Sequence, residues 1–100
     1  PEKKRQLLAE HALLDALMIL NILQTNPQNA EEKLEDYMSN VEVIMEEFAR
    51  MMRNGDRSEE AENAERIKKW VRKASSTASS EEQREMMNRA ITLMQSWIFE

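Results

Sequence analysis

The sequence predicts an all-α fold: an up-down-up-down antiparallel four-helix bundle with short loops, formed as a single domain over residues 1–100. The first observation is that the chain contains one Gly and two Pro, which leaves few residues for the turns that many short strands need. The second is that Leu, Met, Ala, Glu, Lys, Arg and Gln dominate, and these residues form helices readily. The third is that apolar residues recur at helical spacing in four stretches, which short polar segments separate.

The first two helices are expected at about residues 3–25 and 30–53, with the segment NPQNAEE between them. Pro27 cannot continue a helix, because its ring removes a backbone donor and clashes with the preceding turn. Asn29 followed by Glu32 has the spacing of a capping box, in which both side chains bond to backbone N–H groups. The sequence therefore predicts a stop before Pro27 and a restart capped by Asn29.

The third and fourth helices are expected at about residues 58–74 and 80–99. Gly55 suits the left-handed conformation that often ends a helix, and Asp56 or Ser58 would cap the third helix. The connection SSTASS offers two capping boxes for the fourth helix: Ser79 with Glu82, and Ser80 with Gln83.

The loop lengths predict the topology. A helix of ~22 residues is ~33 Å long, whereas a connection of ~5 residues reaches at most ~18 Å. No connection is long enough to return along the bundle. Each helix must therefore run antiparallel to the one before it.

Composition and charge argue against several classes of function. The net charge is -5 and no basic stripe stands out, so no nucleic-acid partner is expected. No uninterrupted apolar run approaches ~18 residues, so no membrane-spanning segment is expected either. No signal peptide is recognisable. The chain has no cysteine, which excludes disulfides and thiol chemistry.

The residue inventory also argues against an enzyme. A di-iron bundle needs Glu-x-x-His on two helices, and the position three residues before His11 is Leu8. His11 and Asp15 have the i, i+4 spacing of a helical pair, which alone is weak evidence for acid–base chemistry. The eight Met residues lie mostly at core spacing, where their flexible side chains fill gaps. We therefore expect no enzymatic activity, no metal and no cofactor.

The first helix carries apolar residues on two opposite sides. At ~100° per residue, the inner side consists of Ala9, Ala12, Ala16, Ile19, Leu20 and Leu23. The opposite side carries a stripe of Leu7, Leu14 and Met18, with His11 and Asp15 along one edge and Glu10, Leu17 and Asn21 along the other. A helix that is apolar all round is either central or bound to something. No helix of a four-helix bundle is central, so this stripe predicts a surface for a protein partner.

The second and fourth helices show the same feature more weakly. The expected core residues are Leu34, Met38, Val41, Met45, Phe48 and Met52 on the second helix and Met86, Ala90, Leu93, Met94 and Trp97 on the fourth. Val43 lies about opposite the first set, near Asp36, Asn40, Glu47 and Ile44. Phe99 lies opposite the second set with Asn88, Thr92 and Gln95, and Ser96 and Ile98 lie at the margins. An incidental surface valine and a frayed helix end remain the alternatives.

The third helix shows no such patch. Ala64, Ile67, Val71 and Ala74 suffice to hold it on the bundle, and Trp70 lies at the edge of that side with an expected structural role.

Three of these segments resemble helices of a known cytokine. EHALLDALMILN resembles the first helix of interleukin-2, DYMSNVEVIMEE resembles its third, and NRAITLMQSWI resembles its fourth. The whole chain, including AEEKLEDY, TAS and the ending QSWIF, is similar to designed four-helix mimetics of interleukin-2 and interleukin-15. The natural fold is up-up-down-down with two long crossovers. In this chain the segment that resembles the third cytokine helix comes second, and it therefore stays antiparallel to the first helix, as in the natural cytokine.

The resemblance implies an agonist that bridges two receptor subunits and acts outside the cell. In the family, the first and third helices bind the interleukin-2 receptor beta subunit, and the first and fourth bind the common gamma chain. Carried over by motif position, the beta-subunit residues are Leu7, His11, Leu14, Asp15, Met18, Asp36, Ser39, Asn40, Val43, Ile44 and Glu47. The gamma-chain residues are Glu10, Leu17, Asn21, Asn88, Thr92, Gln95, Ser96, Ile98 and Phe99.

The resemblance also implies what the chain should not bind. The loop that carries most of the natural alpha-subunit contacts has no counterpart, so no alpha-subunit binding is expected. We expect a monomer when the chain is free. A designed helical scaffold with no partner, or with a redirected receptor specificity, remains an alternative. A bundle that binds a small molecule or a metal would need polar residues directed into the core, and the pattern offers almost none.

Overall fold

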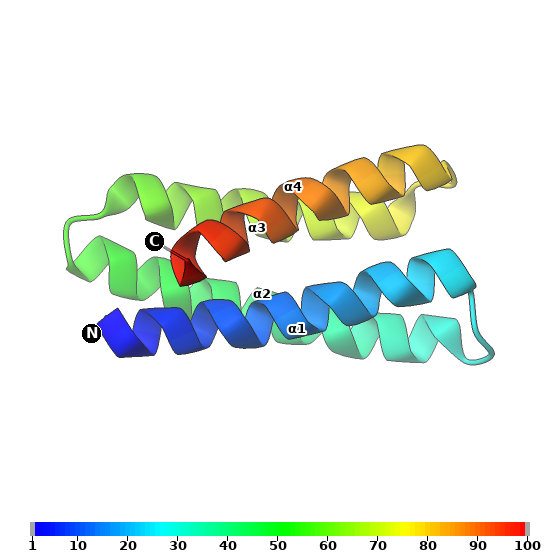
Figure 1. The fold of residues 1–100 in the computed structure, drawn as a ribbon, viewed down its shortest axis with the longest axis horizontal. Helices are drawn as coiled ribbons and strands as arrows, with labels where there is room; N and C mark the ends of the chain where they lie inside the picture. The colour runs from blue at the N-terminus through cyan, green and yellow to red at the C-terminus, as the bar shows by residue number, and fades with distance from the viewer. Residues whose placement is uncertain (1, 100) are drawn as a thin grey trace.

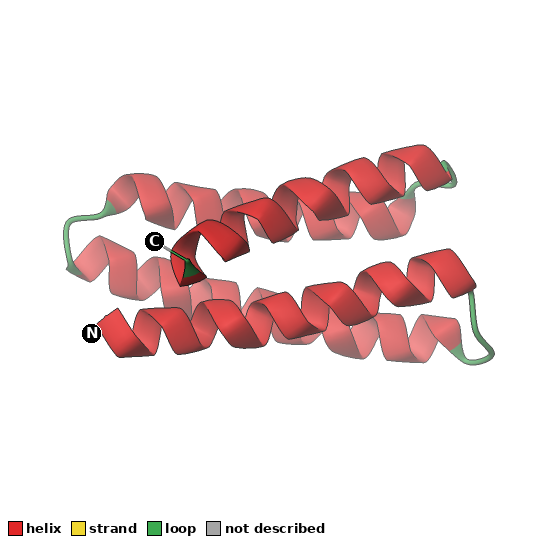
Figure 2. Ribbon diagram, in the orientation of Figure 1, coloured by secondary structure: helices red, strands yellow, loops and turns green. Residues whose placement is uncertain are grey.

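The computed structural model describes residues 2–99, which form a bundle of four helices with short connections (Figure 2). The helices are α1 (Glu2–Thr25), α2 (Ala30–Asn54), α3 (Ser58–Ser76) and α4 (Ser80–Ile98). Successive helices run in opposite directions, as Figure 1 shows, so the predicted all-α, up-down-up-down antiparallel bundle is confirmed. The bundle measures 41 × 20 × 20 Å.

Each helix packs against two neighbours around a square. The packed pairs are α1 with α2, α2 with α3, α3 with α4, and α4 with α1. In the view of Figure 1, α1 and α4 form the near layer, and α2 and α3 lie behind them. The helix α1 therefore borders two others and lies diagonally across the bundle from α3.

The core is built from the predicted inner sides of all four helices. Ile19, Phe48, Ile67 and Met94 are fully buried and come from one helix each. The Phe48 and Trp97 rings stack with their centroids 4.1 Å apart. The fully buried alanines of α1 allow its neighbours to approach closely. Of the expected core residues, Leu20, Leu23, Leu34 and Leu93 are only partly buried, whereas Ile22, Met87 and Ile91, which were not expected, are buried.

The C-terminal end of α1 agrees with the prediction, whereas the end of α2 corrects it. Asn26 has a positive φ of 46° and donates its N–H to the Ile22 carbonyl at 2.8 Å, which is a left-handed helix stop one residue before Pro27. The left-handed residue after α2 is Asp56, with φ 59°, and not Gly55, with φ -97°. The helix extends one residue beyond the expected end at 53, which moves the left-handed position by one residue.

The N-terminal caps agree with the prediction only for α4. Asn29 has a left-handed φ of 65° and makes no side-chain cap, so the capping box with Glu32 was wrong. The residue before α3 is Arg57, and neither Asp56 nor Ser58 caps this helix. Ser79 does cap α4, because its hydroxyl accepts the Glu82 N–H at 3.3 Å.

The alternative box of Ser80 with Gln83 does not form. The Gln83 side chain donates instead to the Thr77 carbonyl at 2.9 Å, and the Glu82 carboxylate accepts from the Thr77 hydroxyl at 2.8 Å. The other bounds differ from the expected ones by one or two residues: α3 continues to Ser76, and α4 ends at Ile98, just before Phe99.

One buried charge has no counterpart in the sequence prediction. Arg5 is 3% exposed and lies near the start of α1. Its guanidinium pairs with the Glu60 carboxylate of α3 at 3.3 Å and with the Glu2 carboxylate at 3.0 Å. These contacts join the first turns of two helices that are diagonal in the bundle, so this end of the molecule is held by charge as well as by apolar packing.

Helix α1 is also long and apolar enough to cross a membrane by length and composition alone. An 18-residue window within it has a mean hydropathy of 1.4, and 28% of that window is buried inside the bundle. The sequence expectation considered only uninterrupted apolar runs, and the apolar runs of α1 are all short. Mean hydropathy tolerates isolated charges such as Glu10 and Asp15.

Candidate functional site

The candidate site is the outer side of α1 together with the two helices that border it. The inner side of α1 is fully buried at Ala12, Ala16 and Ile19. The outer side nevertheless exposes large apolar side chains: Leu7 is 46% exposed, Leu14 62%, Leu17 45% and Met18 41%. The predicted second apolar stripe is therefore present on the surface, where packing within the bundle does not account for it.

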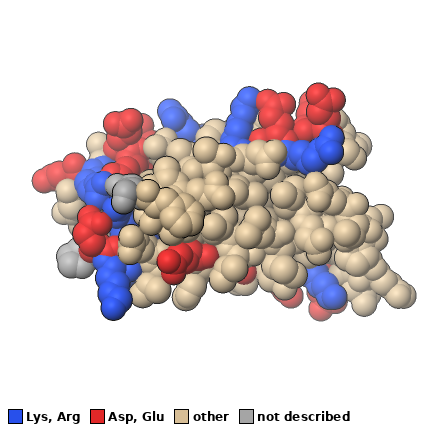
Figure 3. All heavy atoms as spheres, in the orientation of Figure 1, with Lys and Arg blue, Asp and Glu red and all other residues tan. Residues whose placement is uncertain are grey.

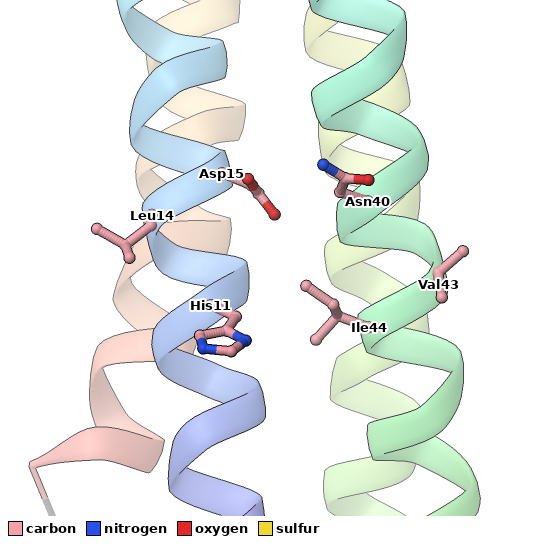
Figure 4. Close-up of a pocket in the computed structure, with 6 residues that line it drawn as sticks. All are labelled: His11, Leu14, Asp15, Asn40, Val43 and Ile44. Atoms are coloured by element: carbon pink, nitrogen blue, oxygen red, sulfur yellow. The ribbon is translucent and has the colours of Figure 1, made fainter.

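We define the α1–α2 face as the residues that the resemblance assigns to the beta subunit: Leu7, His11, Leu14, Asp15, Met18, Asp36, Ser39, Asn40, Val43, Ile44 and Glu47. A hollow of about 390 Å³ lies in the middle of this face. Its lining is drawn in Figure 4 and consists of His11, Leu14, Asp15, Asn40, Val43 and Ile44. Every one of these residues belongs to the predicted set, although α1 and α2 are separate stretches of sequence.

The hollow has a polar centre between apolar sides. Asp15 of α1 and Asn40 of α2 extend toward one another across it, and His11 and Ile44 do so further along the helices (Figure 4). Leu14 and Val43 point outward at the two sides (Figure 4). Val43 is 66% exposed, so the valine predicted on the outer side of α2 does lie in solvent. Such an arrangement presents apolar contact area around a central hydrogen-bonding group.

Partial burial perturbs the carboxyl group at the centre. Burial raises the pKa of Asp15 above its ordinary value of 3.8, whereas the charge of His11 and a hydrogen bond from the Asn40 side chain lower it. Burial has the largest effect of the three. The structure therefore holds a partly desolvated carboxylate that lies near the charge of His11 on α1 and accepts a hydrogen bond from Asn40 on α2.

Two further hollows extend the face along the bundle. One, of about 500 Å³, is lined by the predicted residues Met18 and Asp36 and by Tyr37 and Lys33, which the sequence prediction missed. The other, of about 410 Å³, is lined by Val43, Glu46, Glu47 and Arg50. The signal that could have found Tyr37 is its spacing, three residues before Asn40 on the same helix side.

Two polar members of the face are already engaged within the chain. Glu47 pairs with Lys4 of α1 at 3.1 Å and also with Arg50, and these hydrogen bonds lower its pKa, that from Lys4 first. The Ser39 hydroxyl donates to the Glu35 carboxylate at 3.3 Å. A partner that used Glu47 for hydrogen bonds would have to displace or share these cations.

We define the α1–α4 face as the residues that the resemblance assigns to the gamma chain: Glu10, Leu17, Asn21, Asn88, Thr92, Gln95, Ser96, Ile98 and Phe99. All are exposed except Ile98, which is half-buried and packs against the core. Phe99, just past the end of α4, is 77% exposed. The Gln6 side chain donates to the Ile98 carbonyl at 3.4 Å, which links α1 to this end of α4. The Ser96 hydroxyl donates to the Leu93 carbonyl of its own helix.

The α1–α4 side of the molecule is mostly uncharged. Figure 3 shows this side: most acidic and basic groups lie along the upper edge and at the left end, a few lie along the lower edge and one acidic group lies low on the face, and the rest of the surface is largely neutral. The sequence explains the pattern, because residues 90–99 contain no charged side chain and residues 16–25 of α1 contain none. A broad neutral surface with exposed Leu17 and Phe99 is suited to contact with another protein.

The titratable side chains of the candidate site are distributed over its three hollows. No group of three or more His, Asp or Glu side chains that could hold a metal ion occurs among residues 2–99. The titratable groups that line the hollows are four carboxylates together with His11, Lys33, Tyr37 and Arg50. The site therefore presents apolar contact area together with hydrogen-bond donors and acceptors.

Comparison with protein-family models finds no match to this chain, and comparison with curated proteins finds none either.

Proposed function

We propose that this chain is a designed cytokine mimetic of the interleukin-2/interleukin-15 type, which bridges the interleukin-2 receptor beta subunit and the common gamma chain. The α1–α2 face would bind the beta subunit, and the α1–α4 face would bind the gamma chain. The bundle performs no chemistry in this mechanism. It holds two receptor ectodomains outside the cell at one spacing, so that their cytoplasmic parts meet and signalling begins.

The observation that carries the proposal is that α1 is apolar on its exposed side as well as on its buried side. Leu14, Leu17 and Met18 remain between 41% and 62% exposed in a small chain with a net charge of -5. Exposing such side chains has no benefit for an isolated bundle, and contiguous exposed apolar patches usually mark sites of interaction. A helix that takes part in two interfaces accounts for apolar residues all round it.

The topology is compatible with this role. α1 packs against α2 on one side and against α4 on the other, which supports a role for α1 in both proposed faces. The helix α3 lies diagonally across from α1 and contributes to neither face. Two partners can therefore approach α1 from different sides at the same time.

We assign different roles within the α1–α2 face. Leu14, Met18 and Val43 supply contact area, at ~1.5–3 kcal/mol for each side chain that becomes fully buried. Asp15 supplies a directed acceptor, which burial has already partly desolvated. The resemblance assigns no residues to the alpha subunit, because the corresponding loop is absent.

The test is surface-plasmon resonance with the beta ectodomain alone, the gamma chain alone, and both together, with the alpha subunit as the control. We expect binding to beta that becomes tighter when gamma is present, and none to alpha. Absence of binding to both beta and gamma would refute the proposal. It would favour the alternative, a helical scaffold with no partner or with a redirected receptor specificity.

A further inference from the structure

The methionines of this bundle differ sharply in their exposure. Six of the eight, at positions 38, 45, 52, 86, 87 and 94, are between 0% and 9% exposed. Met51 is partly buried and packs against the core. Met18 is 41% exposed and lies on the outer side of α1. The chain contains no cysteine that would compete for an oxidant.

The surroundings of the sulfur atoms strengthen this difference. Met18 lines the open hollow of about 500 Å³ near the end of α1, where a small solute can reach its thioether. The buried methionines are enclosed by the apolar core. Met38 is shielded further, because the Ser75 hydroxyl donates a hydrogen bond to its sulfur at 2.7 Å. Oxidation of a methionine follows the access of the oxidant to the sulfur.

We infer that Met18 is a selective site of oxidation by hydroperoxides, and that its oxidation weakens binding at the α1–α2 face; this second part rests on the proposed function. In the reaction, the sulfur lone pair attacks one oxygen of the peroxide. The S–O bond forms as the O–O bond breaks, and a proton transfer releases water or an alcohol. The thioether is oxidised to the sulfoxide by two electrons, and the hydroperoxide is reduced by two.

The sulfoxide changes the surface more than it changes the fold. Because Met18 is exposed, the new S–O dipole stays in water and displaces no core packing. A partner that covers this position would have to desolvate that dipole, where the thioether offers only apolar contact. Burying a polar group without a new hydrogen bond lowers affinity by roughly tenfold or more.

The experiment treats the full chain with dilute hydrogen peroxide and follows each methionine by peptide mass spectrometry. Beta-subunit binding is measured before and after treatment for the parent, Met18→Leu and Met51→Leu. We expect Met18 to be oxidised first, with the circular dichroism spectrum unchanged at that point. The affinity should fall roughly tenfold in the parent and in Met51→Leu. The affinity of Met18→Leu before treatment should equal its affinity after treatment.

Each other outcome counts against a stated part of the inference. Oxidation of Met18 no faster than that of the core methionines would overturn the site itself. Rapid oxidation with unchanged beta binding would overturn the effect on the interface and leave the proposed function standing. Untreated parent that binds neither beta nor gamma would refute the proposed function and the interface effect together, whereas the order of oxidation would still decide whether the site exists.

Discussion

Truncation of Leu14 separates binding from folding. The Leu14 side chain is 62% exposed in the free bundle, so most of its apolar area is still in water. Full burial of a leucine contributes ~1.5–3 kcal/mol, so a partner that covers the exposed part gains roughly 1–2 kcal/mol, and Leu14→Ala should lower the affinity roughly five- to thirtyfold. Because little of Leu14 is packed in the fold, and alanine favours a helix, the free energy of unfolding should change by less than about 1 kcal/mol.

Ile19→Ala on the same helix is the matched control. Ile19 is fully buried, so this change should lower the free energy of unfolding by about 2–5 kcal/mol. The assay combines surface-plasmon resonance against the beta ectodomain with urea unfolding of both variants. If folded Leu14→Ala binds beta as tightly as the parent does, Leu14 is not covered by the partner, and the placement of the α1–α2 face is wrong.

Three further predictions test other parts of the structure. Asp15→Lys should weaken beta-subunit binding by several kcal/mol, because it puts an unmatched cation in the interface. The same variant should bind the gamma chain as the parent does. If it binds the beta subunit as tightly as the parent, the assignment of Asp15 to the beta-subunit site is wrong. Arg72 of α3 pairs with Glu35 at 3.0 Å and with Glu42 at 2.6 Å, and these hydrogen bonds lower the pKa of both carboxyl groups from 4.5. The stabilisation by these pairs is therefore present at neutral pH and is lost as the pH falls through the folded-state pKa values. Urea unfolding of Arg72→Gln between pH 7 and pH 3 should show a smaller acid-induced loss of stability than the parent. Ser79→Ala should cost about 1 kcal/mol of stability and Ser80→Ala much less, measured as the shift in thermal midpoint, because the Ser79 hydroxyl caps α4.

The sequence predicts the helices and their packing well because the determinants are local. Apolar periodicity decides which side of each helix is buried, and loop length leaves only alternating directions. The same periodicity identifies Leu14 and Val43 as outer residues, and both are exposed in the structure. Periodicity does not give the distance between side chains on different helices. That Asp15 faces Asn40 across a hollow is a property of the packed pair α1 and α2.

The details that failed depend on contacts between distant residues or on the end of a helix. Gly55 was expected to adopt the left-handed conformation, but α2 is one residue longer than expected, and Asp56 adopts this conformation instead. Arg5 reads as an ordinary surface cation, and it is buried because Glu60 of the diagonal helix pairs with it. Glu47 reads as a free acceptor, and it pairs with Lys4 of another helix. Local sequence gives no sign of such long-range ion pairs.

The diagonal position of α3 has a practical consequence for work with this molecule. Because α3 borders α2 and α4 but lies across the bundle from α1, its outer side is directed away from both proposed faces. The chain has no cysteine, so Glu62→Cys at an exposed position of α3 would create a single thiol for covalent attachment. A dye, a polymer or a solid support joined there would leave α1 open to solution. The outer side of α3 is thus an attachment site through which the bundle can be immobilised in one orientation.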